Sequence, residues 1–163
     1  MLTNDALSAR SSPKAEPALG EMRLEVVVLS VTDIARAAKF YKTIGWREDG
    51  DLTKDGYRLL QFTPPGSACS IILSTAASGI SPAKFLHLVV ADVQTTRVEL
   101  LEKGVEVSEI FHDETGGYNP FSVHARSLGL HPGRASYLTF ATFDDSEGNS
   151  WLLQEVTSRL PGR

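Results

Sequence analysis

The chain has 163 residues, of which 42% are apolar and 22% charged, with a formal net charge of −4. These values fit a globular protein of one domain, or of two half-domains sharing a core, and the acidic balance argues against nucleic acid, whose phosphates need clustered Lys and Arg. No apolar run approaches the roughly 20 residues of a membrane span, and the single Cys69 excludes an internal disulfide. No signal-peptide pattern opens the chain, so we expect a cytoplasmic protein.

The first half of the chain predicts a flexible arm followed by a module of mixed structure. Residues 1–21 are rich in Ala, Ser, Pro and Glu and predict the arm. A first module is expected over 22–74. Its pattern is a β-branched strand, a helix from the N-cap Asp33 to Gly45, a short strand at 46–48, a turn-rich stretch, and strands at 57–63 and 68–73.

The second half repeats this pattern after a small-residue linker at 75–82. A second module is expected over 83–157, with a strand at 85–90, and 158–163 form a tail. Its N-cap Asp92 follows Asp33 by 59 residues, and Gly104 follows Gly45 by the same interval. The second module is longer, and a Gly-, Pro- and His-rich loop insertion at 113–134 accounts for the excess. A repeat of this kind is strong information about the fold.

The last predicted hairpin closes the second module. Strands are expected at 137–143 and 151–156, on either side of Asp144-Asp145-Ser146-Glu147-Gly148-Asn149. The glycine and asparagine tolerate positive φ, and the acidic side chains are expected to hydrogen-bond the turn backbone. Because strand side chains alternate, Gln154 and Glu155 must point to opposite faces.

The chain resembles the vicinal oxygen chelate superfamily of glyoxalases, bleomycin-resistance proteins and extradiol dioxygenases. The resemblance covers about residues 22–157. It rests on Val28-Leu29-Ser30-Val31-Thr32-Asp33 leading into Phe40-Tyr41 and Gly45-Trp46, on Leu88-Val89-Val90-Ala91-Asp92, and on the Asp-Asp-Ser-Glu-Gly-Asn turn. It implies an α+β fold in which two βαβββ modules curl their sheets around a shared cleft. A homodimer, with or without exchanged modules, is implied by the same analogy.

The resemblance also implies four positions for metal ligands, and this chain departs from all of them. The opening strands place Val26 and Phe85 there, and the closing strands place Ser70 and Leu152. None is a usual ligand of a divalent cation. No metal residue is therefore assigned, although a divalent metal at another site is left open.

Two polar residues share the predicted inward face with these positions. His87 follows Phe85 by two residues and is a candidate base or ligand-orienting donor. Gln154 follows Leu152 by two residues and suits a substrate carbonyl or hydroxyl. The alternatives are a structural histidine bonded to a backbone carbonyl and a core glutamine bonded to sheet-edge backbone. Glu155 is expected to face a helix or solvent.

Other candidate ligand-binding residues come from the first module and the insertion. Gln61 is a polar residue within an apolar strand and is expected to face the cleft. Tyr118, Phe121 and Arg126 lie in the insertion, which could close over the cleft as a lid. The spacing of His112, His124 and His131 matches no known metal-binding motif. We therefore expect these histidines to lie in a surface loop.

Three functions are compatible with these patterns. We favour a small-molecule-binding protein that holds an organic ligand in the cleft without the usual metal site. The alternative is a glyoxalase-, isomerase- or lyase-like enzyme that uses a divalent metal or acid–base chemistry by His87 and Gln154. A regulatory interaction module with an empty cleft is the third. The residue pattern does not separate binding from catalysis.

Overall fold

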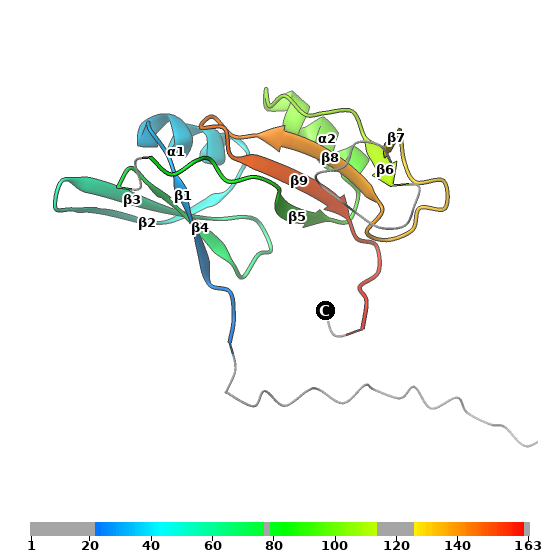
Figure 1. Ribbon diagram of the computed structural model, residues 1–163, viewed down its shortest axis with the longest axis horizontal. Coiled ribbons are helices and arrows are strands. Elements are labelled where there is room, and N and C mark those ends of the chain that lie inside the picture. Colours follow the sequence, from blue (N-terminus) through cyan, green and yellow to red (C-terminus); the bar gives the residue numbers. More distant parts are fainter. Residues whose placement is uncertain (1–21, 77–78, 114–125, 162–163) are drawn as a thin grey trace, which may run out of the picture.

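The computed structural model describes residues 22–76, 79–113 and 126–161. Two modules, each with one helix and one mixed sheet, lie side by side (Figure 1), which confirms the predicted α+β fold. The elements are β1 Val26–Ser30, α1 Ile34–Thr43, β2 Arg47–Lys54, β3 Tyr57–Thr63, β4 Ser70–Ser74, β5 Leu86–Val90, α2 Val93–Glu102, β6 Phe111–Asp113, β7 Arg126–Leu128, β8 Thr139–Asp144 and β9 Ser150–Glu155.

The helix boundaries follow from local capping. The Asp33 side chain accepts the backbone N–H of Arg36 at the start of α1, and Asp92 accepts that of Thr95 at the start of α2, both over 2.9 Å. Gly45 and Gly104 follow the two helices with φ of +88° and +82°, a backbone region that favours glycine. Both helices therefore form where the repeated Asp and Gly predict them.

The two sheets share one strand order. The first runs β1-β4-β3-β2 and the second β5-β9-β8-β6, with β7 added as an outer strand beside β6. In each sheet the opening strand pairs in parallel with the closing strand, and the other pairs are antiparallel. The described end of the insertion thus extends the second sheet by one strand.

Strand β2 corrects the sequence analysis, which expected a turn-rich stretch over 49–56. Residues 47–54 form a strand that is exposed throughout, and only Asp55 and Gly56 turn, both with positive φ. Asp and Gly are poor strand formers. Here, cross-strand contacts compensate: Asp49 accepts the Thr63 hydroxyl, and Asp51 forms an ion pair with Arg58.

Strand ends also shift by one or two residues. Strand β4 begins at Ser70 rather than residue 68, β8 begins at Thr139 rather than 137, and β5 begins at Leu86. Phe85 and Tyr137 precede these strands with φ of +57° and +72°. Left-handed backbone cannot continue a strand, so both residues lie outside the sheet.

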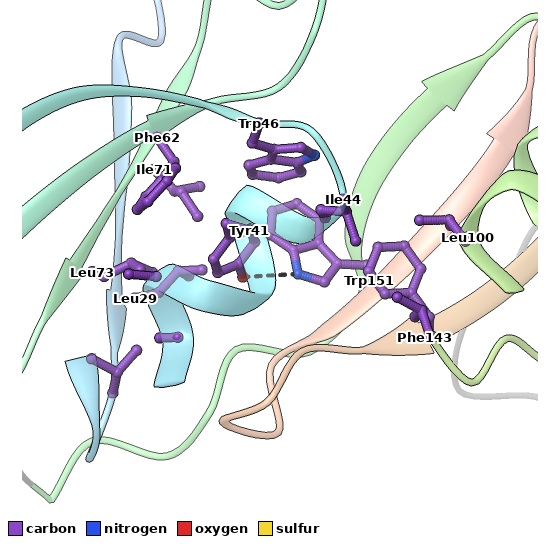
Figure 2. Close-up of a cluster of buried hydrophobic side chains, with 14 of the residues drawn as sticks. Leu29, Tyr41, Ile44, Trp46, Phe62, Ile71, Leu73, Leu100, Phe143 and Trp151 are labelled. Carbon is purple, nitrogen blue, oxygen red and sulfur yellow. Dashed lines mark hydrogen bonds between the residues drawn. The ribbon is translucent and has the colours of Figure 1, made fainter. Parts of the chain in front are cut away.

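The helix-facing sides of the two sheets share one core. Tyr41 of α1 and Ile44, which caps that helix, meet Phe143 and Trp151 of the second module (Figure 2), and all four belong to one buried cluster. The Tyr41 ring lies 4.8 Å from Trp46 and 6.4 Å from Trp151, centroid to centroid. Each module therefore buries apolar surface that it could not cover alone.

The described helices are too short and too polar to cross a membrane.

Candidate functional site

Each sheet has a second side, opposite its helix, which we call the helix-free face. In the first sheet, Val26 pairs with Ser70 and Val28 pairs with Ile72, which in turn pairs with Gln61. The side chain of Val28 is 57% exposed although it is apolar. Gln61 is half-buried in the centre of this face. The face is thus a mainly apolar surface with one central amide.

The helix-free face of the second sheet brings together several predicted site residues. Leu152 of β9 pairs with His87 on one side and Thr142 on the other. In the next row, Gln154 lies between Val89 and Phe140. His87 and Gln154 are therefore diagonal neighbours on adjacent strands and point to the same face.

An apolar cluster forms the floor of this second face. Phe111, Phe140 and Leu152 pack together apart from the main core, and Phe140 and Leu152 are fully buried. The rings of Phe111 and Phe140 stack at 5.6 Å, and the Arg126 guanidinium lies 4.6 Å from the centre of the Phe111 ring. A buried aromatic cluster therefore lies beneath this face, with a cation packed against it.

The two candidate catalytic residues differ in their surroundings. The His87 side chain is exposed on β5. Gln154 is half-buried, and its amide donates to the backbone carbonyl of Tyr137 over 3.1 Å. That bond corresponds to the structural alternative for this glutamine, because a donor held by backbone must release it to serve a substrate.

The positions implied for metal ligands do not suit a metal. Val26, Phe85 and Leu152 have no donor atoms, and the Ser70 hydroxyl is 2.6 Å from that of Thr63. Thr63 in turn donates to Asp49, and hydrogen bonds from Arg47 and Thr63 hold the pKa of Asp49 below its ordinary value. Among the described residues no group of three or more His, Cys, Asp or Glu is arranged to hold a metal ion.

Glu155 faces α2, as expected from the alternation of β9. Its carboxylate is fully buried, accepts the backbone N–H of Val93 over 3.1 Å and forms an ion pair with Arg134. Negative charge at a helix N-terminus is stabilising. Glu155 therefore supports the fold and is remote from the helix-free face.

The insertion residues divide into described and undescribed ones. Tyr118, Phe121 and His124 lie outside the described residues. His112, expected in a surface loop, is instead buried in β6, and its Nδ1 is 3.0 Å from the carbonyl of Gly129. The His131 ring packs edge-on against it at 5.8 Å. These two histidines serve local structure in the turn that follows β7.

The aromatic floor was not predicted from the sequence. Phe140 and Thr142 belong to the strand before the last turn, and Phe111 belongs to a strand of three residues. Counting back from the turn would have found the first two, because Asp144 pairs with Ser150 and places Phe140 opposite Gln154. Phe111 could not be found in this way, because β6 has only three residues and forms by pairing with β7 and β8.

Comparison with known families gives one match. A model of the glyoxalase/bleomycin resistance protein/dioxygenase superfamily matches residues 23–153. No curated protein sequence matches the chain.

Solved structures share this fold. TnmS3, an antibiotic-binding protein from Streptomyces sp. CB03234, is 24% identical over 83% of this chain and 97% of its own, with a TM-score of 0.61. A glyoxalase/bleomycin resistance protein from the same organism is 25% identical over 82% and 100%, with a TM-score of 0.59. A mutant of glyoxalase I from Zea mays is 15% identical over 83% of this chain and 46% of its own, at a TM-score of 0.59.

Proposed function

Because the chain belongs to the glyoxalase/bleomycin resistance protein/dioxygenase superfamily, we propose that it binds a small organic ligand on its helix-free faces without the family's usual metal site. The observation that carries this proposal is the kind of residue found at the positions where the family holds its metal. Leu152 is fully buried in an aromatic floor where a metal site would require a donor. Apolar surface with a few polar groups at its edge is typical of small-molecule sites.

The ligand expected from this surface is aromatic and carries oxygen or nitrogen acceptors. Phe111 and Phe140 form a buried aromatic floor beneath this face, and Arg126 and His87 lie at its margins. Gln61 adds an amide on the first sheet. The similarity to an antibiotic-binding protein supports a role in holding such a compound.

Native mass spectrometry with a panel of aromatic natural products, bleomycin included, tests this proposal. We expect at least one 1:1 complex, weakened about tenfold by His87→Ala, because losing one polar contact costs about 1–1.5 kcal/mol. Lys54→Ala is the matched control, an exposed residue on β2. Complexes that respond equally to both substitutions, or to neither, contradict binding at this face.

Metal content tests the second half of the proposal. Protein purified without a chelator and without a histidine tag is expected to carry far less than one equivalent of nickel, zinc, iron or manganese by elemental analysis. A near-stoichiometric content of any of these ions would contradict the metal-free proposal.

A glyoxalase-like lyase or isomerase is the second candidate. The observation in its favour is the exposed imidazole of His87 diagonal to Gln154 on one face. In that function His87 would act as the base and Gln154 as a donor to developing negative charge. Conversion of a bound compound, followed by mass change and lost in His87→Ala, would distinguish catalysis from binding.

We also infer a homodimer that pairs helix-free faces. Val28, Leu52 and Leu128 are apolar and 57%, 53% and 81% exposed, and apolar residues left exposed on a sheet face favour association. Light scattering after size exclusion should give twice the chain mass of 17.7 kDa. Val28→Lys should shift the protein toward monomer, whereas Val98→Lys on the exposed side of α2 should not.

A further inference from the structure

The repeat gives this chain two junctions between its modules, each between one helix and the last turn of the other module. At the first junction, α1 meets the β8–β9 turn. Tyr41 donates to Asp145 over 2.6 Å, and Arg36 and Thr32 bond to the Glu147 carboxylate over 2.8 Å. We call this the latched junction, because charged and polar groups close it.

The second junction is where α2 meets the β3–β4 turn, residues 64–67. The repeat interval of 59 residues places Leu100 where α1 has Tyr41. Two prolines occupy the turn in place of the acidic cluster. Within the described ranges, no hydrogen bond or ion pair joins α2 to this turn, and a hollow of about 470 Å³ lies between them. We call this the open junction.

The walls of the hollow are apolar and its rim is charged. Trp46, Pro64, Pro65 and Leu100 form part of the walls, which also include core residues of both modules. Trp46 and Leu100 are only 7% and 8% exposed, so the hollow reaches the edge of the shared core. A volume of this size is within the range of small-molecule pockets.

The charge of the rim selects the kind of ligand. Two cations and one acid line the hollow. Lys103 directly follows α2, Arg159 belongs to the C-terminal segment, and Glu99 is the acid. All three side chains belong to exposed residues and can turn toward a bound molecule. With two cations against one carboxylate, the rim favours an anion.

We propose that the open junction binds a small apolar anion, such as an aromatic carboxylate or sulfonate, with its ring against Trp46 and the two prolines and its charge at Lys103 and Arg159. This site lies mainly on the helix side of the sheets, and His87 and Val89 of β5 also line its edge. The two junctions differ because the repeat is imperfect: the polar latch of the first junction is missing from the second.

Titration with 1-anilinonaphthalene-8-sulfonate, followed by fluorescence and calorimetry, tests this site. We expect 1:1 binding that the double variant Lys103→Glu, Arg159→Glu weakens about tenfold, through loss of two partly exposed charge contacts. The control is Lys39→Glu, Lys54→Glu, which changes the net charge equally at exposed residues outside the hollow. Equal weakening in both double variants would overturn the proposal.

A variant of opposite sign separates binding from loss of structure. Glu99→Gln removes the one carboxylate at the rim and should tighten 1:1 binding several-fold, with the urea midpoint of unfolding unchanged. Glu102→Gln, exposed on the same helix but outside the hollow, should leave the affinity unchanged. Equal effects of both substitutions, or none, overturn the site. Because His87 also lines the hollow, Arg126→Ala, on the helix-free face and outside the hollow, is the separate readout, so either proposal can fail alone.

Discussion

Tyr41 of α1 donates its hydroxyl to Asp145, which lies 104 residues later on the last turn of the other module, over 2.6 Å. The same hydroxyl accepts the indole N–H of Trp151 over 3.2 Å (Figure 2). Asp145 also accepts the backbone N–H groups of Glu147 and Asn149, over 2.8 and 2.9 Å. One buried carboxylate thus organises its own turn and fixes the helix of the other module to it.

Tyr41→Phe is expected to lower the free energy of unfolding by about 1–3 kcal/mol, because it leaves the buried Trp151 indole without its acceptor and Asp145 without one donor. Urea unfolding followed by circular dichroism measures the change. Tyr57→Phe is the control, since Tyr57 is a half-buried residue of β3, outside the latched junction. A loss of similar size in both variants would mean that the hydrogen bonds of the Tyr41 hydroxyl do not stabilise the fold.

The same tyrosine predicts a loss of stability in alkali. Burial, together with the charge of Asp145, raises the pKa of Tyr41 far above its ordinary value of 10.0. Because the folded pKa exceeds the unfolded one, its stabilising contribution is complete below pH 10 and declines above it, by up to about 1.4 kcal/mol per pH unit. The stability gap between wild type and Tyr41→Phe should therefore shrink between pH 10 and 11. A gap that stays constant over this range would contradict the raised pKa.

Glu147 predicts the opposite behaviour in acid. Burial alone would raise the pKa of this side chain, which is 1% exposed, but hydrogen bonds from Thr32, Arg36 and Asp33 outweigh it and lower the pKa. A lowered folded pKa gives stability that is present above the ordinary value of 4.5 and is lost as the pH falls through the folded value.

Glu147→Gln should therefore cost about 1 kcal/mol at pH 7, since a neutral amide keeps only part of these bonds and Arg36 is partly exposed. The cost should shrink as the pH falls below the ordinary value of 4.5 and disappear once the pH has passed the lowered folded pKa, where wild type is protonated as well. Urea unfolding at pH 7, 5 and 3 measures it. Glu106→Gln, exposed on the same module, is expected to show no difference at any of these pH values.

Sequence could predict the parts of this fold that local chemistry decides. Asp33 and Gly45 define α1 because capping and positive φ act within one turn. Residues 49–54 were misjudged because their strand depends on Thr63 and Arg58, which lie across the hairpin. Contacts between strands are not visible in the residue pattern of one strand alone.

The candidate site shows the same division. The alternation of side chains along a strand was enough to predict that Gln154 and Glu155 point to opposite faces of the sheet. It could not show that Gln154 would bond to Tyr137, because that carbonyl is presented by a residue with left-handed backbone. Nor could it show that Glu147 would leave its own turn for Arg36, a contact 111 residues apart in the chain.

The buried pair of Glu155 and Arg134 gives the last prediction, because its two members are unequally exposed. The Glu155 carboxylate is fully buried and accepts three contacts from Arg134 of 3.0–3.2 Å, whereas the Arg134 side chain is 42% exposed. Removing the arginine leaves a buried charge with only the N-terminus of α2 for compensation. Removing the charge on Glu155 leaves an arginine that water can solvate.

Arg134→Ala should therefore destabilise the protein by about 3 kcal/mol, and Glu155→Gln by about 1–2 kcal/mol, because the glutamine oxygen still accepts the Val93 N–H. The double variant should be more stable than Arg134→Ala alone, since no buried charge remains unpaired. Urea unfolding of the three variants at pH 7 closes this cycle. A double variant at least as unstable as the sum of the single changes would show that the arginine acts by packing rather than by charge.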